Sequence, residues 1–152
     1  MPNQETITIM PAYGEAIGMS IHHVDGASLT VKVPYAAHLV GDPDTGVIHG
    51  GVITAALDNA SGWAVRAGTQ WVEGMGMATL DIRIDYMKPA TPEKDLLVTA
   101  QCYKQTRTIA FVRAVAYHDS QDDPVATSVA SFMMGTPNDP RESVTDSSKQ
   151  VS

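Results

Sequence analysis

The sequence predicts an α+β fold in which a six-stranded antiparallel sheet wraps around one long helix. Three observations favour this fold. Only residues 52–67 combine the length, the alanine content and the wide apolar stripe of a long helix. Two strand-like segments precede that helix and four follow it, and the short turns between them favour antiparallel pairing. A sheet with a single helix must bury that helix against one of its faces.

The first elements are expected to be a short helix and a hairpin. Residues 11–17 are helix-like and are followed by a glycine. Residues 19–24 and 27–33 have the alternation of half-buried strands, and Asp25-Gly26 predicts the tight turn between them.

A loop at residues 34–48, rich in turn formers, leads into the long helix. The helix is expected to run over residues 52–67 and to end near Gly68. Its apolar stripe consists of Val52, Ile53, Ala56, Leu57, Ala60, Trp63 and Ala64. That stripe is the face expected against the sheet.

Four strands follow the helix. Residues 79–86 alternate in character, with Leu80, Ile82, Ile84 and Tyr86 on one face and Thr79, Asp81, Arg83 and Asp85 on the other. The remaining strands are expected at residues 96–104, 108–118 and 125–134, joined by turns at 105–107 and 119–124.

Composition and charge restrict the function classes. The 152 residues suit one domain, expected over residues 1–135, with a disordered tail at 136–152 that is rich in Pro, Asp, Ser and Lys. The net charge of -7 argues against a nucleic-acid partner, which usually requires a basic face. The single Cys102 permits no internal disulfide, and neither a signal peptide nor an apolar run of about 20 residues is visible. We therefore expect a cytoplasmic protein with no membrane partner.

Two glycines stand where the long helix begins. Gly50 and Gly51 leave backbone N–H groups accessible at a helix N-terminus, where the dipole adds positive potential. Such a turn suits an anion or a developing oxyanion. The alternative is that the glycines only let the loop turn into the helix.

Asp58 is the one acid within the helix. It forms a polar strip with Thr54, Ser61 and Gly62, which are small residues, whereas a solvated face usually carries Lys and Glu. A lone carboxylate at mid-helix gains nothing from the dipole. This pattern suits a general base or a nucleophile, and the alternative is an ordinary solvated face.

The spacing of these groups has a geometric consequence. Gly50 and Asp58 are eight residues apart, about 12 Å along a helix that rises ~1.5 Å per residue. One reacting carbonyl cannot contact both in a single chain. If both serve one reaction, the site lies between two chains, and two-fold symmetry creates two equivalent sites in a homodimer.

These residues resemble a known family. The segment at 46–51, Gly-Val-Ile-His-Gly-Gly, followed by Asp58, resembles the hotdog-fold acyl-CoA thioesterases of the phenylacetate-degradation (PaaI-like) type. Residues 79–90 resemble the strand after the helix in that family, and residues 106–111 resemble a later turn and strand. The resemblance extends over about residues 35–134 and implies the hotdog fold.

The resemblance also implies an activity and an assembly. It implies hydrolysis of an acyl-CoA by a homodimer at least, and often a homotetramer, with sites at the dimer interface. The Gly50 N–H would polarise the thioester carbonyl beside His49, and Asp58 of the partner chain would activate water or attack the carbonyl. Thr79 would position the water. No cofactor is expected, since coenzyme A is part of the substrate.

The loop before the helix departs from the family pattern. The family often has an Asn-Pro there, whose amide helps to polarise the carbonyl, whereas this chain has Asp42-Pro43. A carboxylate cannot donate a hydrogen bond unless it is protonated. Either Asp42 has another role, or the Gly50 N–H works with His49 alone.

The remaining expectations concern ligands. Lys88, Lys104 and Arg107 are the candidates for contacts with the coenzyme A phosphates, and Gly51 is a further candidate for binding coenzyme A. No metal site is expected, because the adjacent His22 and His23 point to opposite faces of a strand. The side chains expected in the core or in an acyl pocket are Trp63, Trp71, Met75 and Met77.

Two other functions remain open at this point. One is a hotdog hydratase or dehydratase, in which a histidine such as His49 would work with an acid. The other is a non-catalytic acyl-CoA binding module, which would need no carboxylate at Asp58.

Overall fold

The computed structural model describes residues 10–68, 72 and 74–137 of the chain. Its elements in chain order are α1 (Ala12–Ala16), β1 (Ser20–Asp25), β2 (Ser28–Val33), the short 3-10 helix η2 (Ala37–Leu39), β3 (Val40–Asp42), β4 (Val47–Ile48), α2 (Gly50–Arg66), β5 (Gly76–Tyr86), β6 (Leu96–Gln105), β7 (Ile109–Tyr117) and β8 (Ala126–Thr136). Among them α2 is the one long helix, as the sequence predicts.

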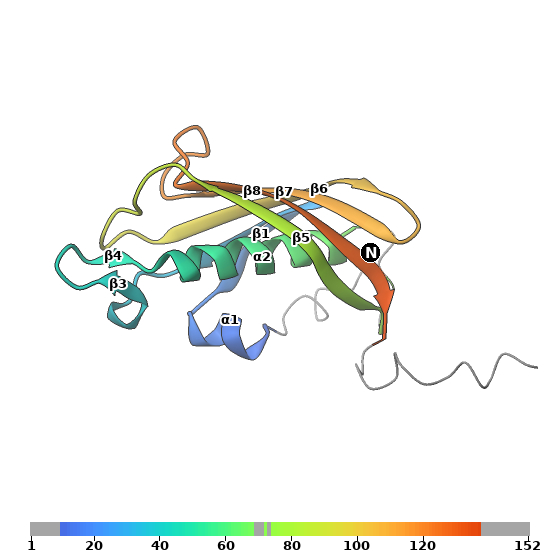
Figure 1. The fold of residues 1–152 in the computed structure, drawn as a ribbon, viewed down its shortest axis with the longest axis horizontal. Coiled ribbons are helices and arrows are strands. Elements are labelled where there is room, and N and C mark those ends of the chain that lie inside the picture. The colour runs from blue at the N-terminus through green and yellow to red at the C-terminus, as the bar shows by residue number, and fades with distance from the viewer. Residues whose placement is uncertain (1–9, 69–71, 73, 138–152) are drawn as a thin grey trace, which may run out of the picture.

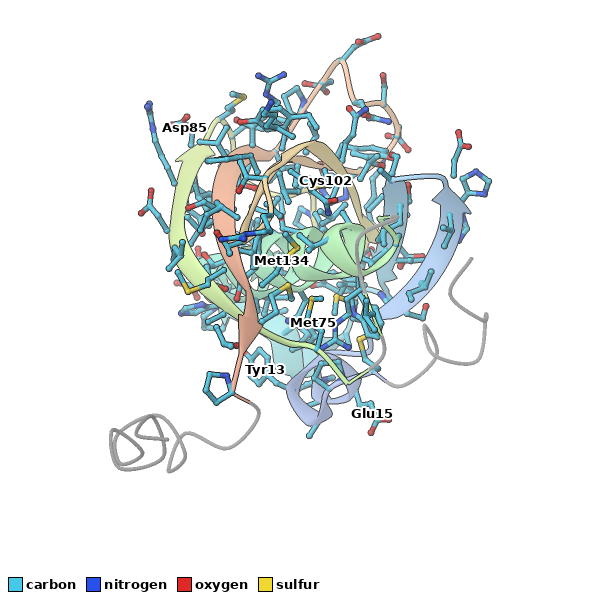
Figure 2. All side chains as sticks on the ribbon, turned by 90° about the vertical axis from the view of Figure 1, so that its right-hand side faces the viewer. Tyr13, Glu15, Met75, Asp85, Cys102 and Met134 are labelled. Carbon is cyan, nitrogen blue, oxygen red and sulfur yellow. The ribbon has the colours of Figure 1, made fainter. Side chains whose placement is uncertain are left out.

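Six strands form one antiparallel sheet in the order β1-β2-β6-β7-β8-β5. The helix α2 lies along one face of this sheet (Figure 1) and contacts five of its strands. The view turned by 90° shows the strands arching over α2 (Figure 2). This arrangement confirms the predicted hotdog fold.

The core lies between α2 and the concave face of the sheet. Leu29, Val31 and Val33 of β2 point into it and are at most 2% exposed, so the predicted alternation of this strand is confirmed. From α2, Ala56 and Ala60 are fully buried. Because alanine side chains are short, the helix axis can approach the sheet closely, and the buried residues form one continuous cluster.

The edge strand β5 corrects one prediction about site residues. Thr79 pairs with Phe132 and Asp81 pairs with Ser131, so Leu80 is an extra residue in a β-bulge. A bulge shifts the alternation of side chains by one residue. Thr79 therefore lies on the helix-facing side with Ile82, and its predicted place on the opposite face is wrong.

Other boundaries also differ from the sequence prediction. The predicted loop at 34–48 contains η2 and a small hairpin of β3 and β4. The strand β5 pairs with β8 and not with its neighbour in sequence, β6. β8 extends to Thr136, while the rest of the predicted tail, from residue 138, and Trp71 lie outside the described residues. Within the described part of the chain, no helix is long and apolar enough to cross a membrane.

Candidate active site

The helix α2 begins at a cap formed by a histidine side chain. His49 has extended backbone angles (φ −62°, ψ 135°), and its Nδ1 accepts a hydrogen bond from the Gly51 N–H at 2.8 Å. A neutral imidazole that accepts at Nδ1 carries its proton on Nε2. The cap starts the helix at Gly50, two residues before the predicted start, and leaves an Nε2–H donor on an exposed ring.

The two glycines at this turn have different roles. A Cβ on Gly51 would lie 2.8 Å from Nδ1 of His49, so only glycine lets the imidazole cap the helix. A Cβ on Gly50 would meet only the Tyr86 ring, at 3.8 Å, which is an ordinary contact. The Gly50 N–H has no acceptor among the described residues. Gly51 thus serves the cap, and Gly50 presents a donor.

A tyrosine of the sheet, which the sequence does not mark as a site residue, hydrogen bonds to this turn. The Tyr86 hydroxyl at the end of β5 donates to the Gly50 carbonyl oxygen at 2.9 Å, and Thr54 Oγ1 donates to the same oxygen at 3.1 Å. The two hydroxyl groups are also in hydrogen-bond contact with each other, so their two hydrogens serve three contacts: when one hydroxyl donates to the other, only one of them donates to the carbonyl oxygen. The Gly50–Gly51 peptide is therefore held at its oxygen by these hydroxyls and at its N–H by His49. The sequence contains one indication of this role: Tyr86 occupies a strand position where the alternation predicts an aliphatic residue.

Asp58 and Thr79 form the second half of the candidate site. Thr79 Oγ1 donates to Asp58 Oδ1 at 3.0 Å, and this contact exists because the bulge turns Thr79 toward α2. Among the described residues, none donates to Asp58 Oδ2. Since the Thr79 hydroxyl hydrogen is used on Asp58, its oxygen can accept a hydrogen bond from a water held between the two side chains.

A pocket of about 120 Å³ opens beside Asp58. It is lined by Pro11, Asp58, Asn59, Gly62, Trp63, Arg66, Met77, Thr79 and Phe132. Of the residues predicted for the core or an acyl pocket, Trp63 and Met77 line it, while Met75 packs against the core. The guanidinium of Arg66 lies 5.0 Å from the Trp63 ring, and burial lowers the pKa of Arg66.

Within one chain the two halves of the candidate site lie apart. Gly50 and Asp58 both belong to α2 and are eight residues apart, or about 12 Å along its axis. Tyr86 and Thr79, their respective contacts, are separated in the same direction along β5. The Gly50 donor and the Asp58 carboxylate of one chain therefore do not converge on a single carbonyl group.

Asp42 has a structural role in the β3–β4 hairpin. Its carboxylate accepts hydrogen bonds from Thr45 Oγ1 at 2.8 Å and from the Asp44 N–H at 3.0 Å. The bond from Thr45, followed by that from Asp44, lowers the pKa of Asp42. Asp42 is thus ionised and engaged in its own turn, which favours the alternative that it has a role other than polarising a carbonyl.

The three cationic side chains predicted to contact coenzyme A do not lie together within one chain. Lys88 follows β5 near the start of α2 and forms an ion pair with Asp123 at 2.5 Å. Lys104 and Arg107 lie at the β6–β7 hairpin, at the opposite end of α2 from β4 (Figure 1). A 17-residue helix is about 25 Å long. Within the described ranges, no group of His, Cys, Asp and Glu side chains is arranged to hold a metal.

Comparison with known sequences identifies relatives over most of the chain. A model of the thioesterase superfamily matches residues 45–125. The chain is 26% identical to the medium/long-chain acyl-CoA thioesterase YigI of Escherichia coli K12 over 136 residues, which is 81% of this chain and 85% of that protein. It is 35% identical to human acyl-coenzyme A thioesterase 13 over 66 residues, which is 43% of this chain and 45% of that protein.

Solved structures show the same architecture. A Pseudomonas aeruginosa protein superimposes with a TM-score of 0.71 at 37% identity, over 80% of this chain and 88% of that one. A putative thioesterase of Ralstonia eutropha, related to phenylacetic acid degradation, superimposes with a TM-score of 0.74 at 24% identity, over 86% and 97% of the two chains. The chain belongs to the thioesterase superfamily: it is a thioester hydrolase with the hotdog fold of the phenylacetate-degradation (PaaI-like) proteins.

Proposed function

We propose that the protein hydrolyses acyl-CoA thioesters as a homodimer, in which the Gly50 turn of one protomer and Asp58 of its partner form each site. The observation that carries this proposal is the separation of about 12 Å between two groups with open hydrogen-bonding positions, the Gly50 N–H and Asp58 Oδ2. The names of the relatives YigI and human thioesterase 13 support coenzyme A as the thiol part of the substrate. No cofactor is needed, because coenzyme A enters as part of the substrate.

The edge strand β5 supports dimerisation. It has no partner on its outer side in the described sheet and exposes Leu80 (51%), Tyr86 (52%) and, just beyond it, Met87 (56%). Antiparallel pairing of two β5 strands around a two-fold axis near residues 82–83 would place Thr79 opposite Tyr86 of the partner subunit. Because Thr79 contacts Asp58 and Tyr86 contacts Gly50, this pairing would bring each carboxylate to the other chain's glycine turn.

The proposed reaction uses these groups in sequence. Water donates one hydrogen bond to Thr79 Oγ1 and gives a proton to Asp58 Oδ2 while its oxygen attacks the thioester carbon. The Gly50 N–H of the other chain stabilises the carbonyl oxygen as it becomes negative. The intermediate then expels the coenzyme A thiolate, which takes up the proton, and the free acid leaves.

A nucleophilic role for Asp58 is the alternative chemistry. Attack by Oδ2 on the carbonyl carbon would form a mixed anhydride and expel the thiolate, and water would then hydrolyse the anhydride. A single turnover in ¹⁸O-labelled water, followed by mass spectrometry of the peptide that contains Asp58, distinguishes the two roles. Label in that peptide indicates an anhydride that water opens at the Asp58 carbonyl carbon, and label in the released acid alone, with none in the peptide, is the result expected of general-base catalysis.

Hydrolysis is favoured over hydration. Membership of the thioesterase superfamily supports hydrolysis. In addition, Nδ1 of His49 is occupied by the Gly51 N–H, so this histidine caps the helix and points a donor, not a base, outward.

The same two-fold axis would bring cationic side chains of the two chains to the same site. Antiparallel neighbouring helices place the end of one α2 beside the start of the other. Lys88 of one protomer would then lie on the same side as Lys104 and Arg107 of the partner subunit, flanking one site from two chains. This arrangement supports the prediction that these residues contact the coenzyme A phosphates. Assembly of dimers into a homotetramer and a cytoplasmic location stay predictions.

A subunit-mixing experiment tests the shared site. Asp58→Asn and Gly50→Pro chains, each expected to be almost inactive alone, are unfolded together, refolded at equal concentrations and assayed for thiol release from acyl-CoA. Each heterodimer then has one site with both lesions and one site with none. We expect the mixture to recover about a quarter of wild-type activity per chain, since half of the dimers are mixed.

The controls for mixing are each variant refolded alone and wild type refolded with Asp58→Asn. Wild type refolded with Asp58→Asn should show about half of wild-type activity per chain and so calibrates the yield of refolding. Activity in the mixture of the two lesions, when neither variant is active alone, supports the shared site. A mixture that stays as inactive as its components, although native mass spectrometry detects heterodimers, contradicts it.

Tyr86→Phe is expected to lower kcat about three- to tenfold with little change in KM. The change removes a hydroxyl that contacts both Gly50 and Thr54 and donates one hydrogen bond, worth about 0.5–1.5 kcal/mol net; this hydroxyl positions the Gly50–Gly51 peptide without touching the substrate. Steady-state kinetics on an acyl-CoA check this, with Tyr13→Phe on the exposed side of α1 as the matched control. A rise in KM at constant kcat, or the same loss in Tyr13→Phe, contradicts a positioning role.

A further inference from the structure

The pocket beside Asp58 follows one face of α2. Asp58, Gly62 and Arg66 are spaced by four residues, so they lie one above the other on the helix. Gly62 leaves the space between the other two open because it has no side chain. A Cβ there would already lie 3.1 Å from the Met77 methyl group. The pocket therefore extends from the carboxylate along the helix toward Arg66.

Arg66 stands at the far end of this pocket. Side chains on a helix point back toward its N-terminus, so the Arg66 guanidinium lies over the preceding turn, 5.0 Å from the ring of Trp63. Trp63 is 4% exposed and is held by the core. The guanidinium thus rests on a fixed surface, and it keeps its positive charge although burial lowers its pKa.

We propose that Arg66, held on Trp63, closes the acyl pocket and restricts the protein to acyl groups about the size of one aromatic ring or a short aliphatic chain. This inference rests on the proposed function, because it assumes that the acyl group of the substrate enters the pocket beside Asp58. Arg66 is then a specificity-determining residue that sequence reasoning did not select.

The size of the pocket supports this limit. Its volume is about 120 Å³, and a dry apolar cavity of about 150 Å³ is known to accept benzene. The side walls are apolar or aromatic, with Trp63, Met77 and Phe132. A single ring or a chain of a few carbons fills such a space.

The charge of Arg66 also disfavours long acyl chains. A longer alkyl chain would have to pass the guanidinium and remove water from it, which is unfavourable for a charged group. An aromatic acyl group would instead offer a π face to the cation. The pocket therefore favours a ring-bearing acyl group, or a short one, over a long alkyl chain.

The test is a substrate profile of the full-length protein. We would measure kcat/KM for hexanoyl-CoA, phenylacetyl-CoA and decanoyl-CoA with wild type and Arg66→Ala. We expect wild type to favour hexanoyl-CoA and phenylacetyl-CoA over decanoyl-CoA at least tenfold. In Arg66→Ala the ratio of decanoyl to hexanoyl turnover should rise about tenfold, since the end of the pocket opens.

The chain offers a matched control. Arg113 on β7 also stacks on an aromatic ring, 4.0 Å from that of Tyr103, but it does not line the pocket. Arg113→Ala removes the same type of contact and should leave the chain-length profile as in wild type. Arg66→Met is the second variant, because it keeps an unbranched side chain of similar length without the charge. It should raise the decanoyl ratio several-fold even if Arg66→Ala does not fold.

The outcomes separate this inference from the proposed function. A wild type that prefers decanoyl-CoA, or a profile in folded Arg66 variants that changes no more than in Arg113→Ala, overturns the inference alone. A wild type that releases thiol from none of the acyl-CoAs overturns the proposed function itself.

Discussion

Asp58→Asn is expected to lower kcat for acyl-CoA hydrolysis by about a hundredfold to ten-thousandfold, the usual contribution of a general base. The asparagine oxygen can still accept the hydrogen bond from Thr79, so the local structure should persist. What is lost is the carboxylate oxygen Oδ2, which is proposed to take the proton from water or to attack the carbonyl. The prediction is checked by measuring thiol release at saturating concentration of an acyl-CoA that the wild-type protein hydrolyses.

The control for this variant is Asp25→Asn. Asp25 lies at the turn between β1 and β2, at the other edge of the sheet from β5, and the substitution makes the same change in charge. It should keep wild-type kcat, and thermal unfolding should show that both variants are folded. If Asp58→Asn retains more than about a tenth of wild-type kcat, Asp58 is not the base or nucleophile.

Gly50→Pro is expected to lower kcat by about a hundredfold to a thousandfold, the usual loss when one oxyanion donor is removed. Proline has no N–H, so it deletes the one group that Gly50 is proposed to contribute. The backbone can accept it, because Gly50 is the first residue of α2 and His49 has the extended angles preferred before proline. We therefore expect the melting temperature to stay level or rise slightly.

Gly50→Ala is the matched comparison for the proline variant. It adds the same Cβ, which meets only the Tyr86 ring at 3.8 Å, but it keeps the N–H. The difference in kcat between the two variants isolates the donor from the added bulk. Equal activity in Gly50→Ala and Gly50→Pro would show that the Gly50 N–H does not stabilise the transition state.

Local patterns account for the parts of the fold that could be predicted. In β2 the alternation of Leu29, Val31 and Val33 corresponds directly to burial of 0–2% exposure. The apolar stripe of α2 predicts which side faces the sheet, since helix periodicity depends only on residues a turn apart. The helix α2 begins at Gly50, two residues before the start that its apolar stripe predicts, because the His49 side chain caps it there.

Predictions that depended on long-range pairing were less accurate. In the sequence, polar and apolar residues alternate through Leu80 without a break. In the structure, the bulge against β8 interrupts this alternation and turns Thr79 toward Asp58. Leu80 and Tyr86, expected on a buried face, are half exposed because β5 is an edge strand. A bulge and an edge are properties of a strand's neighbours, so its own residues do not reveal them.

The sequence by itself predicted the long helix, the six strands of the main sheet and the hotdog class, and it singled out the two chemical groups proposed for the site, because hydrophobic periodicity and the spacing from Gly50 to Asp58 are encoded over a few helical turns. The tertiary structure decided which side chains accompany those groups. Tyr86 reaches Gly50, Thr79 reaches Asp58 and Arg66 lines the pocket only after strands and helix have packed. These contacts join residues distant in the chain, and their geometry is determined by sheet register and helix position rather than by any local propensity.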